Sequence, residues 1–260
     1  MAKIWTREEN ELLKELTLKG KSRQEVADIF GVTVSSIQNK VRRMKLTRKP
    51  NKNIRFFKDI DTEEKAYWLG FIAADGCVSV NEKTNSCEIS IQLQANDVNH
   101  LKKFNKAING NVQPTFYKQL CNLNNKYETC CRFRLYNQEM ANDLIKHNVV
   151  PRKSLTLKFP VTINDEYIRH FIRGYFDGNG CIIKSRCDFT CASDDFIKSL
   201  RQILYDNNIF TYVTEQKDNK SKRLVITGKD NIVTFLNYIY SESTVYLDRK
   251  YNRFLKYYKD

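Results

Sequence analysis

The sequence has no long hydrophobic run and no closely paired cysteines. None of its apolar stretches approaches the roughly 18 residues that a membrane-spanning helix needs, and the start MAKIWTREENELL lacks the apolar core of a secretory signal. The eight cysteines show no C-x-x-C spacing and the three histidines stand far apart, which argues against a structural zinc site. We therefore expect an intracellular protein, in the cytoplasm or nucleoid, whose reduced cysteines pack as small apolar side chains.

Positive charge is what the sequence has in excess. It carries 44 Lys and Arg against 30 Asp and Glu, a net charge of +14 over 260 residues. This bias favours a polyanionic partner such as nucleic acid, and the alternative is a soluble surface that is basic without such a partner. Hydrophobic residues at 41% and aromatic residues at 12% are enough to build a core. The chain is therefore predicted to be globular, with two or three compact units.

The first 46 residues are predicted to form a small all-α domain of three short helices. Thr6 with Glu9, and Ser22 with Glu25, form capping-box patterns at two helix starts, and the third helix starts at Thr33. The predicted apolar faces are Leu12, Leu13 and Leu16 in the first helix, Val26, Ile29 and Phe30 in the second, and Val34, Ile37, Val41 and Met44 in the third.

The other faces of the third helix carry hydroxyl, amide and basic groups: Ser35, Ser36, Gln38, Asn39, Lys40, Arg42 and Arg43. Amide and guanidinium groups can read base edges with paired hydrogen bonds. The arrangement resembles a helix-turn-helix, and IWTREEN resembles the start of Myb-like domains. The resemblance implies a DNA-recognition helix. The alternative is the solvated face of a three-helix bundle.

A basic linker is predicted over residues 47–64. This region has one proline, no apolar periodicity and many side chains suited to phosphate, and the candidate contacts are Arg48, Lys49, Lys52 and Arg55. Residues 1–58 hold 15 Lys and Arg against 6 Asp and Glu, so most of the excess charge lies at the front of the chain.

The remainder of the chain contains an internal duplication. YWLGFIAADGCVSV at 67–80 and FIRGYFDGNGCIIK at 171–184 share an apolar run, a central glycine, small residues, and then a polar residue followed by Gly-Cys. Each copy is followed by alternating strand patterns and helical stretches in the same order. We therefore predict an α+β fold made of two αββαββα halves, at 65–160 and 161–260.

The two copies resemble the motif of the LAGLIDADG homing endonucleases, and the resemblance covers residues 65–260. Gly70 and Gly174 remove side-chain bulk, which lets the two motif helices approach closely. The resemblance implies a pseudo-symmetric saddle of two sheets laid in the DNA major groove. It also implies a monomer that acts on a long, imperfectly symmetric double-stranded site, with magnesium-dependent hydrolysis of phosphodiesters across the minor groove.

In that family the acidic residue before the last motif glycine projects toward the scissile phosphates, and here the two positions are Asp75 and Asn179. Two carboxylates can hold divalent metal and activate water. An amide oxygen can touch magnesium but is neutral and takes no proton at working pH. We therefore expect slow cutting, nicking or no cutting. Asp177 matches a structural position of the motif.

The resemblance also implies a basic residue near the site. Lys229 is the match in the second half, although a solvated loop lysine is equally consistent. The polar strand faces would contact DNA or would be ordinary solvent-facing surface, and their candidates are Gln92, Gln94, Arg132, Arg134, Lys184, Arg186 and Arg223.

Asn179 leaves other functions open. A retired nuclease could remain a sequence-specific binder such as a transcriptional repressor, because the recognition surfaces do not need that residue. An RNA-binding splicing helper on the same scaffold is a third hypothesis. An introduced substitution would also account for the asparagine.

Overall fold

The computed structural model describes residues 3–18, 21–44, 46, 53–81, 83–84, 86–121, 125–215 and 221–258. The chain forms two compact units, Met1–Asn53 and Ile54–Asp260. Over the described ranges, no helix combines the length and the apolar character that crossing a membrane requires.

The first unit contains the three predicted helices: α1 (Arg7–Leu18), α2 (Arg23–Phe30) and α3 (Val34–Arg43). Both predicted capping boxes are present. The Thr6 hydroxyl accepts from the Glu9 amide at 3.2 Å and the Glu9 carboxylate accepts from the Thr6 amide at 3.0 Å, and Ser22 and Glu25 make the same reciprocal pair. Local side-chain hydrogen bonds therefore start α1 and α2.

The core of the first unit is narrower than the sequence pattern predicted. Leu13, Val26 and Ile37 are completely buried. Leu12 and Ile29 were expected to face inward, but these residues are 41% and 53% exposed. The prediction was wrong because three short helices cover only a thin stripe of each other, so an apolar residue one position off that stripe stays in water.

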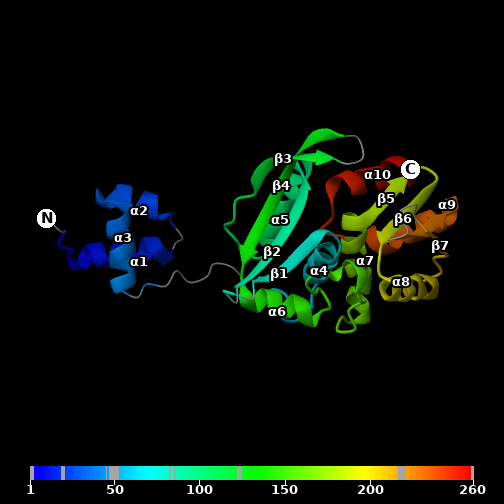
Figure 1. Cartoon of the computed structure of the whole chain (residues 1–260), viewed down its shortest axis with the longest axis horizontal. Coiled ribbons are helices and arrows are strands. Elements are labelled where there is room, and N and C mark those ends of the chain that lie inside the picture. Colours follow the sequence, from blue (N-terminus) through cyan, green and yellow to red (C-terminus); the bar gives the residue numbers. More distant parts are fainter. Residues whose placement is uncertain are drawn as a thin grey trace. The chain divides into compact units, whose positions relative to one another are not determined.

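The second unit contains two halves that share the order helix, two strands, helix, two strands, helix, and the second half ends with one further helix (Figure 1). The first half comprises α4 (Glu63–Asp75), β1 (Gly76–Asn81), β2 (Ser86–Gln94), the 3-10 turn η1 (Ala95–Asp97), α5 (Val98–Ala107), β3 (Thr115–Cys121), β4 (Lys126–Tyr136), α6 (Gln138–Lys146) and the 3-10 turn η2 (Lys153–Leu155). The second comprises α7 (Asp165–Asn179), β5 (Gly180–Ile183), β6 (Arg186–Cys191), α8 (Asp194–Asp206), β7 (Tyr212–Glu215), β8 (Lys222–Thr227), α9 (Lys229–Tyr240) and α10 (Asp248–Tyr258).

Each half forms a four-stranded antiparallel sheet, and the strand orders correspond. They are β1-β2-β4-β3 in the first half and β5-β6-β8-β7 in the second. Helices cover one face of each sheet, where alternate strand residues such as Ile89, Ile91 and Phe189 are buried. The other face, called the outer face below, carries polar side chains. The predicted duplicated α+β fold is confirmed.

The second unit begins earlier than the sequence predicted. Phe56, Phe57 and Ile60 fall within the predicted linker, yet they are buried in the core of the second unit. His147 also contacts the main-chain oxygen of Phe57 at 2.8 Å. Because basic residues flank these apolar residues, the sequence pattern indicated a linker. The structure places the boundary between the two units between Asn53 and Ile54.

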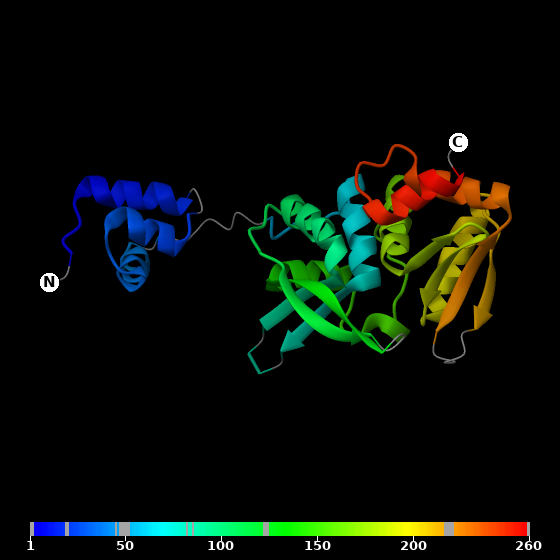
Figure 2. The same ribbon diagram turned by 90° about the horizontal axis from the view of Figure 1, so that it is seen from above.

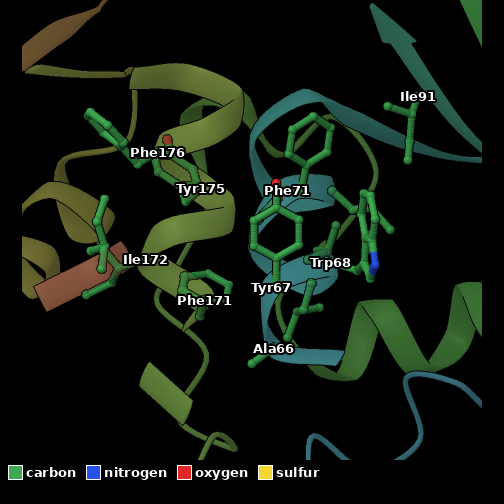
Figure 3. Close-up of a cluster of buried hydrophobic side chains, with 14 of the residues drawn as sticks. Ala66, Tyr67, Trp68, Phe71, Ile91, Phe171, Ile172, Tyr175 and Phe176 are labelled. Carbon is green, nitrogen blue, oxygen red and sulfur yellow. The ribbon is translucent and has the colours of Figure 1, made fainter. Parts of the chain in front are cut away.

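Helices α4 and α7 lie side by side between the two sheets (Figures 1 and 2). A methyl group on Gly70 would lie 2.0 Å from the main-chain oxygen of Phe171, and one on Gly174 would lie 1.9 Å from that of Tyr67. The helices therefore meet backbone to backbone, as the two glycines predicted. Aromatic side chains from both helices fill the space around this contact (Figure 3).

Asp177 ties the helix pair to the rest of the second half. Its carboxylate is fully buried and accepts hydrogen bonds from Tyr67 Oη at 2.8 Å, Tyr240 Oη at 2.6 Å and the Leu247 amide at 2.7 Å. Burial raises the pKa of Asp177, and these donors act in the opposite direction. Its contacts are those of a structural residue, as predicted.

Candidate active site and nucleic-acid interface

The structure brings Asp75 and Asn179 to neighbouring helix ends. Asp75 is the last residue of α4 and Asn179 the last of α7. A methyl group on Gly178 would lie 2.3 Å from the Ala74 Cβ and 3.3 Å from the Asp75 Cγ. The two helices thus remain in contact up to their final turns, and a strand leaves each end.

Asp75 is a partly exposed carboxylate surrounded by cations. Burial raises its pKa, while the charges of Lys250, Arg249 and Lys153 lower it and that of Asp97 raises it. Arg249 in turn donates a 2.8 Å hydrogen bond to Asp97, so this pair joins the second half to the first. The arrangement concentrates positive charge around one carboxylate, as a phosphate-binding site requires.

Asn179 lies at the edge of a cavity of about 190 Å³. Lys153, Thr190 and Ser221 also line this cavity. The Asn179 amide donates a long 3.5 Å hydrogen bond to Tyr175 Oη. A neutral amide therefore occupies the position that corresponds to Asp75 in the first half.

Two lysines at this site were not predicted from the sequence. Lys153 donates to the main-chain oxygen of Gly76, directly after α4. Lys250 donates to that of Phe176 at 2.6 Å and approaches that of Gly178 at 3.4 Å, at the end of α7. Each ammonium stabilises the negative end of a motif helix. Burial lowers the pKa of both amines, that of Lys250 to about 8.

A repeated dipeptide could have identified the two lysines. Arg-Lys occurs at 152–153 and again at 249–250, in each case 70 to 77 residues after the final motif glycine. In a chain with 44 Lys and Arg this repeat is hard to notice, and only the fold carries each lysine back to a motif helix.

Lys229 lies away from the helix ends. It is the first residue of α9, after β8. Strand β8 begins beside the cavity, because Ser221, the residue before it, lines the cavity. The strand ends at Thr227, which pairs with Arg186 beside the β5–β6 turn and lies two residues before Lys229. At about 3.3 Å per strand residue, roughly 20 Å separates the two ends. The structure therefore does not bring Lys229 to the cavity beside Asn179.

The first outer face carries a hydrogen-bonded array. Arg132 donates to Gln92 Oε1 at 2.6 Å and to Tyr117 Oη at 3.0 Å, and its guanidinium lies 4.8 Å from the Tyr117 ring centre. Gln92 donates to Gln119 at 2.6 Å. Tyr117 and Gln119 come from β3, a strand whose side chains the sequence pattern did not single out. The four candidates Gln92, Gln94, Arg132 and Arg134 all lie on this face.

The second outer face places Arg186 and Arg223 beside the buried carboxylate of Asp188. Lys184, which was expected on a strand face, lies in the two-residue turn between β5 and β6. The expected strand is shorter because the chain reverses after Ile183, where Ile183 pairs with Arg186.

The candidate DNA-contact residues of the first unit have mixed outcomes. On α3 the predicted polar residues are exposed or partly exposed, and Arg42 donates to Asn39 at 3.1 Å. Arg48, Lys49 and Lys52 lie outside the described residues. Arg55 belongs to the second unit and lies 3.6 Å from the Glu139 carboxylate on α6, which packs on the helix-covered side of the first sheet.

The site can hold a divalent cation at one helix end. Among the described residues, no group of three His, Cys, Asp or Glu side chains could form a metal cage. Magnesium needs only one or two protein carboxylates when substrate phosphates and water complete its coordination. Asp75 meets that requirement, and the neutral oxygen of Asn179 meets it poorly.

Comparisons with known proteins agree with this architecture. Residues 166–240 match the family model of the LAGLIDADG-like domain. A search of curated proteins gives no match. Mesophilic variants of the homing endonuclease I-DmoI share 15% identity and a TM-score of 0.50, over 73% of this chain and 93% of theirs. The homing endonuclease I-WcaI bound to its DNA recognition sequence shares 15% identity with this chain. Its TM-score is 0.53, over 71% of this chain and 84% of that chain. I-DmoI in complex with DNA and calcium shares 16% identity with this chain. Its TM-score is 0.50, over 73% of this chain and 92% of that chain.

The family match covers most of α7 and the sheet that follows it. The first half repeats the same strand order around its own motif helix. At these identities the structural matches establish the fold. Residues 166–240 are thus similar to the LAGLIDADG-like domain, and the second unit has the fold of the homing endonucleases I-DmoI and I-WcaI.

Proposed function

We propose that the protein binds a specific double-stranded DNA site and hydrolyses one phosphodiester bond in preference to its counterpart on the other strand. The observation that carries this proposal is the pair of helix ends, which presents a carboxylate at Asp75 and an amide at Asn179. The two DNA strands would then meet chemically different groups.

At the Asp75 end, the carboxylate would hold a magnesium or manganese ion together with phosphate oxygens and water. A bound divalent ion activates water and neutralises negative charge at a phosphorus centre. Lys153 and Lys250 contribute fixed positive charge from the ends of the two motif helices. Charge held in place before the reaction stabilises a transition state without reorganisation.

At the Asn179 end, the amide oxygen is a weaker ligand and accepts no proton. The strand that lies over this end should be cut slowly or not at all. The expected product is therefore a nick at a defined position.

The outer faces of the two sheets would contact the DNA grooves, and their arginine and amide side chains suit base edges. The first unit would extend the contact through the polar face of α3. A single chain with two unlike halves suits a long, imperfectly symmetric site.

The test begins with selection of the bound sequence from a pool of random duplexes. A supercoiled plasmid carrying that sequence is then incubated with magnesium or manganese. We expect open-circular plasmid from the unaltered protein and linear plasmid from Asn179→Asp. Linear plasmid from the unaltered protein at the same rate as from the variant would contradict an impaired half-site.

A second candidate function is sequence-specific binding without cleavage, as in a repressor. Asn179 favours it, because binding does not need the second carboxylate. In the same assay, tight binding with no cleavage by either protein would support this function and exclude the nuclease.

A further inference from the structure

Asp188 is a buried carboxylate on the outer face of the second sheet, which none of the described helices covers. It lies on β6, opposite Cys181 on one neighbouring strand and Val225 on the other. The adjacent residues Cys187 and Phe189 face the core on the opposite side of the sheet. The Asp188 side chain is nevertheless only 4% exposed. A buried carboxylate on a recognition surface needs cationic partners.

Two arginines supply that partnership. Arg186 Nε donates a 2.9 Å hydrogen bond to Asp188 Oδ2, and Arg223 Nε forms an ion pair with Asp188 Oδ1 at 3.3 Å without a hydrogen bond. The arginine side chains remain 38% and 35% exposed. One carboxylate thus holds two guanidinium groups on the outer face from two different strands.

The position of Nε beside the carboxylate determines which nitrogens of each guanidinium remain for hydrogen bonds to DNA. A guanidinium has five N–H donors, and when Nε faces the carboxylate, hydrogen-bonded in Arg186 and ion-paired in Arg223, the two terminal nitrogens are not used by that contact. Those nitrogens form the pair that matches O6 and N7 of guanine in the major groove. A side chain that is already held in place loses less conformational freedom on binding.

We propose that Asp188 is a positioning residue that aims Arg186 and Arg223 at two guanines in the half of the DNA site bound by the second sheet. This inference rests on the proposed DNA binding and adds a base preference to it. Because one carboxylate joins the two arginines, the guanines lie within about three base pairs of each other, at about 3.4 Å per pair.

The first sheet offers a matched comparison. Its outer face also pairs an arginine with a carboxylate, but Arg134 and Glu88 are 3.7 Å apart and their side chains are 48% and 24% exposed. This longer and more exposed ion pair involves one arginine, whose side chain is largely in contact with solvent. Among the described residues, one carboxylate shared by two arginines is therefore found on the second outer face and not on the first.

The experiment compares sequence profiles selected from random duplexes by the full chain, by Asp188→Asn and by the control Glu88→Gln. For Asp188→Asn we expect the two guanine preferences in one half-site to weaken by about tenfold, while preferences in the other half-site persist. Affinity for random-sequence DNA should not fall, because a negative charge has been removed. Glu88→Gln should leave the two guanine preferences unchanged.

A purely structural role for Asp188 would lower the melting temperature without changing the profile, and that result would overturn the proposal. If Asp188→Asn does not fold, Arg186→Lys and Arg223→Lys carry the test, because each should weaken a different guanine preference. Unchanged profiles in both would equally overturn the proposal. Selection of no sequence by the unaltered chain would instead overturn the proposed DNA binding, and this inference with it.

Discussion

The ammonium group of Lys250 donates a 2.6 Å hydrogen bond to the main-chain oxygen of Phe176 in the last turn of α7. Lys153 makes the corresponding contact with Gly76 at the end of α4. Both lysines also lie close enough to Asp75 for their charges to lower its pKa. The two motif helices therefore end in one shared, positively charged centre.

The charge of Lys250 should make cleavage depend on pH. Burial lowers the pKa of this amine to about 8, so its charge is lost as the pH rises through about 8. We expect single-turnover nicking of bound DNA to slow above that pH, measured between about pH 6.5 and 9.5. Lys250→Met should be slower throughout and lack this transition. A wild-type rate that keeps rising to pH 9.5 would count against the assignment.

The lowered pKa of Lys250 also makes the free energy of unfolding depend on pH. Its folded-state pKa of about 8 lies below the ordinary lysine value of 10.5. Between these values the unfolded chain binds more protons than the folded chain. The contribution of Lys250 to the free energy of unfolding should therefore increase with pH across this window. Denaturant titrations of wild type and Lys250→Met over that range measure the difference.

Asp75→Asn should abolish nicking and preserve binding. Loss of the carboxylate that would hold the divalent ion should slow single-turnover cleavage by at least about 1000-fold, which corresponds to several kcal/mol in the barrier. Affinity for the selected site should stay equal or rise slightly, because a negative charge near phosphate is removed. Gel-shift titration measures binding, and a plasmid nicking assay measures cleavage. Retained cleavage would exclude Asp75 as the metal ligand.

Gly174→Ala should destabilise the second unit strongly. The new methyl group would lie 1.9 Å from the main-chain oxygen of Tyr67, so the two helices would have to separate. We expect the free energy of unfolding to fall by at least about 3 kcal/mol in urea titration. The control is Gly228→Ala, where the nearest atom lies 3.9 Å away and only a φ of +85° opposes the change. Its cost should be about 1 kcal/mol.

Asp177→Asn should also destabilise the fold, for a different reason. The amide nitrogen would face donors where the carboxylate now accepts from Tyr67, Tyr240 and the Leu247 amide. Leaving buried donors unpaired should cost about 2–4 kcal/mol. Asp59→Asn, at an exposed position, should change the free energy of unfolding by less than about 0.5 kcal/mol. Equal effects of the two substitutions would contradict the role assigned to Asp177.

Removal of the first unit should shorten the DNA footprint and reduce the salt dependence of binding. For each phosphate that the shortened protein no longer neutralises, the slope of log affinity against log salt should decrease by about 0.9. Footprinting and salt titration of residues 54–260 against the full chain provide the measurement. An unchanged slope and footprint would show that α3 does not bind DNA.

Local signals in the sequence predicted much of this structure. The capping pairs at Thr6 and Ser22 start helices through bonds that span only three residues. Gly70 and Gly174 predicted close helix contact, because only a missing side chain permits it. The alternating strands predicted the outer face that carries Gln92 and its neighbours.

Burial and location were predicted less accurately where they were assigned from a residue's place in the sequence pattern alone. Leu12 and Ile29 fit a helical apolar pattern but remain exposed, because packing partners decide which part of an apolar stripe is covered. Lys229 follows a strand, but the register places it at the far end of that strand from the cavity. Phe56 and Phe57 were predicted to lie in a linker, but they are buried in the core of the second unit.

By itself, the sequence determined the duplicated fold, the helix contact through glycine, and the pairing of Asp75 with Asn179, because each depends on local geometry repeated in two halves. Only the tertiary structure decided that Lys153 and Lys250 occupy the helix ends and that one carboxylate holds Arg186 and Arg223. Apart from Arg186 and Asp188, which are two residues apart on β6, those contacts join residues far apart in the chain or on separate strands. Their charges meet because the fold brings them together, and the repeated Arg-Lys dipeptide marks the two lysines without giving their place in the fold.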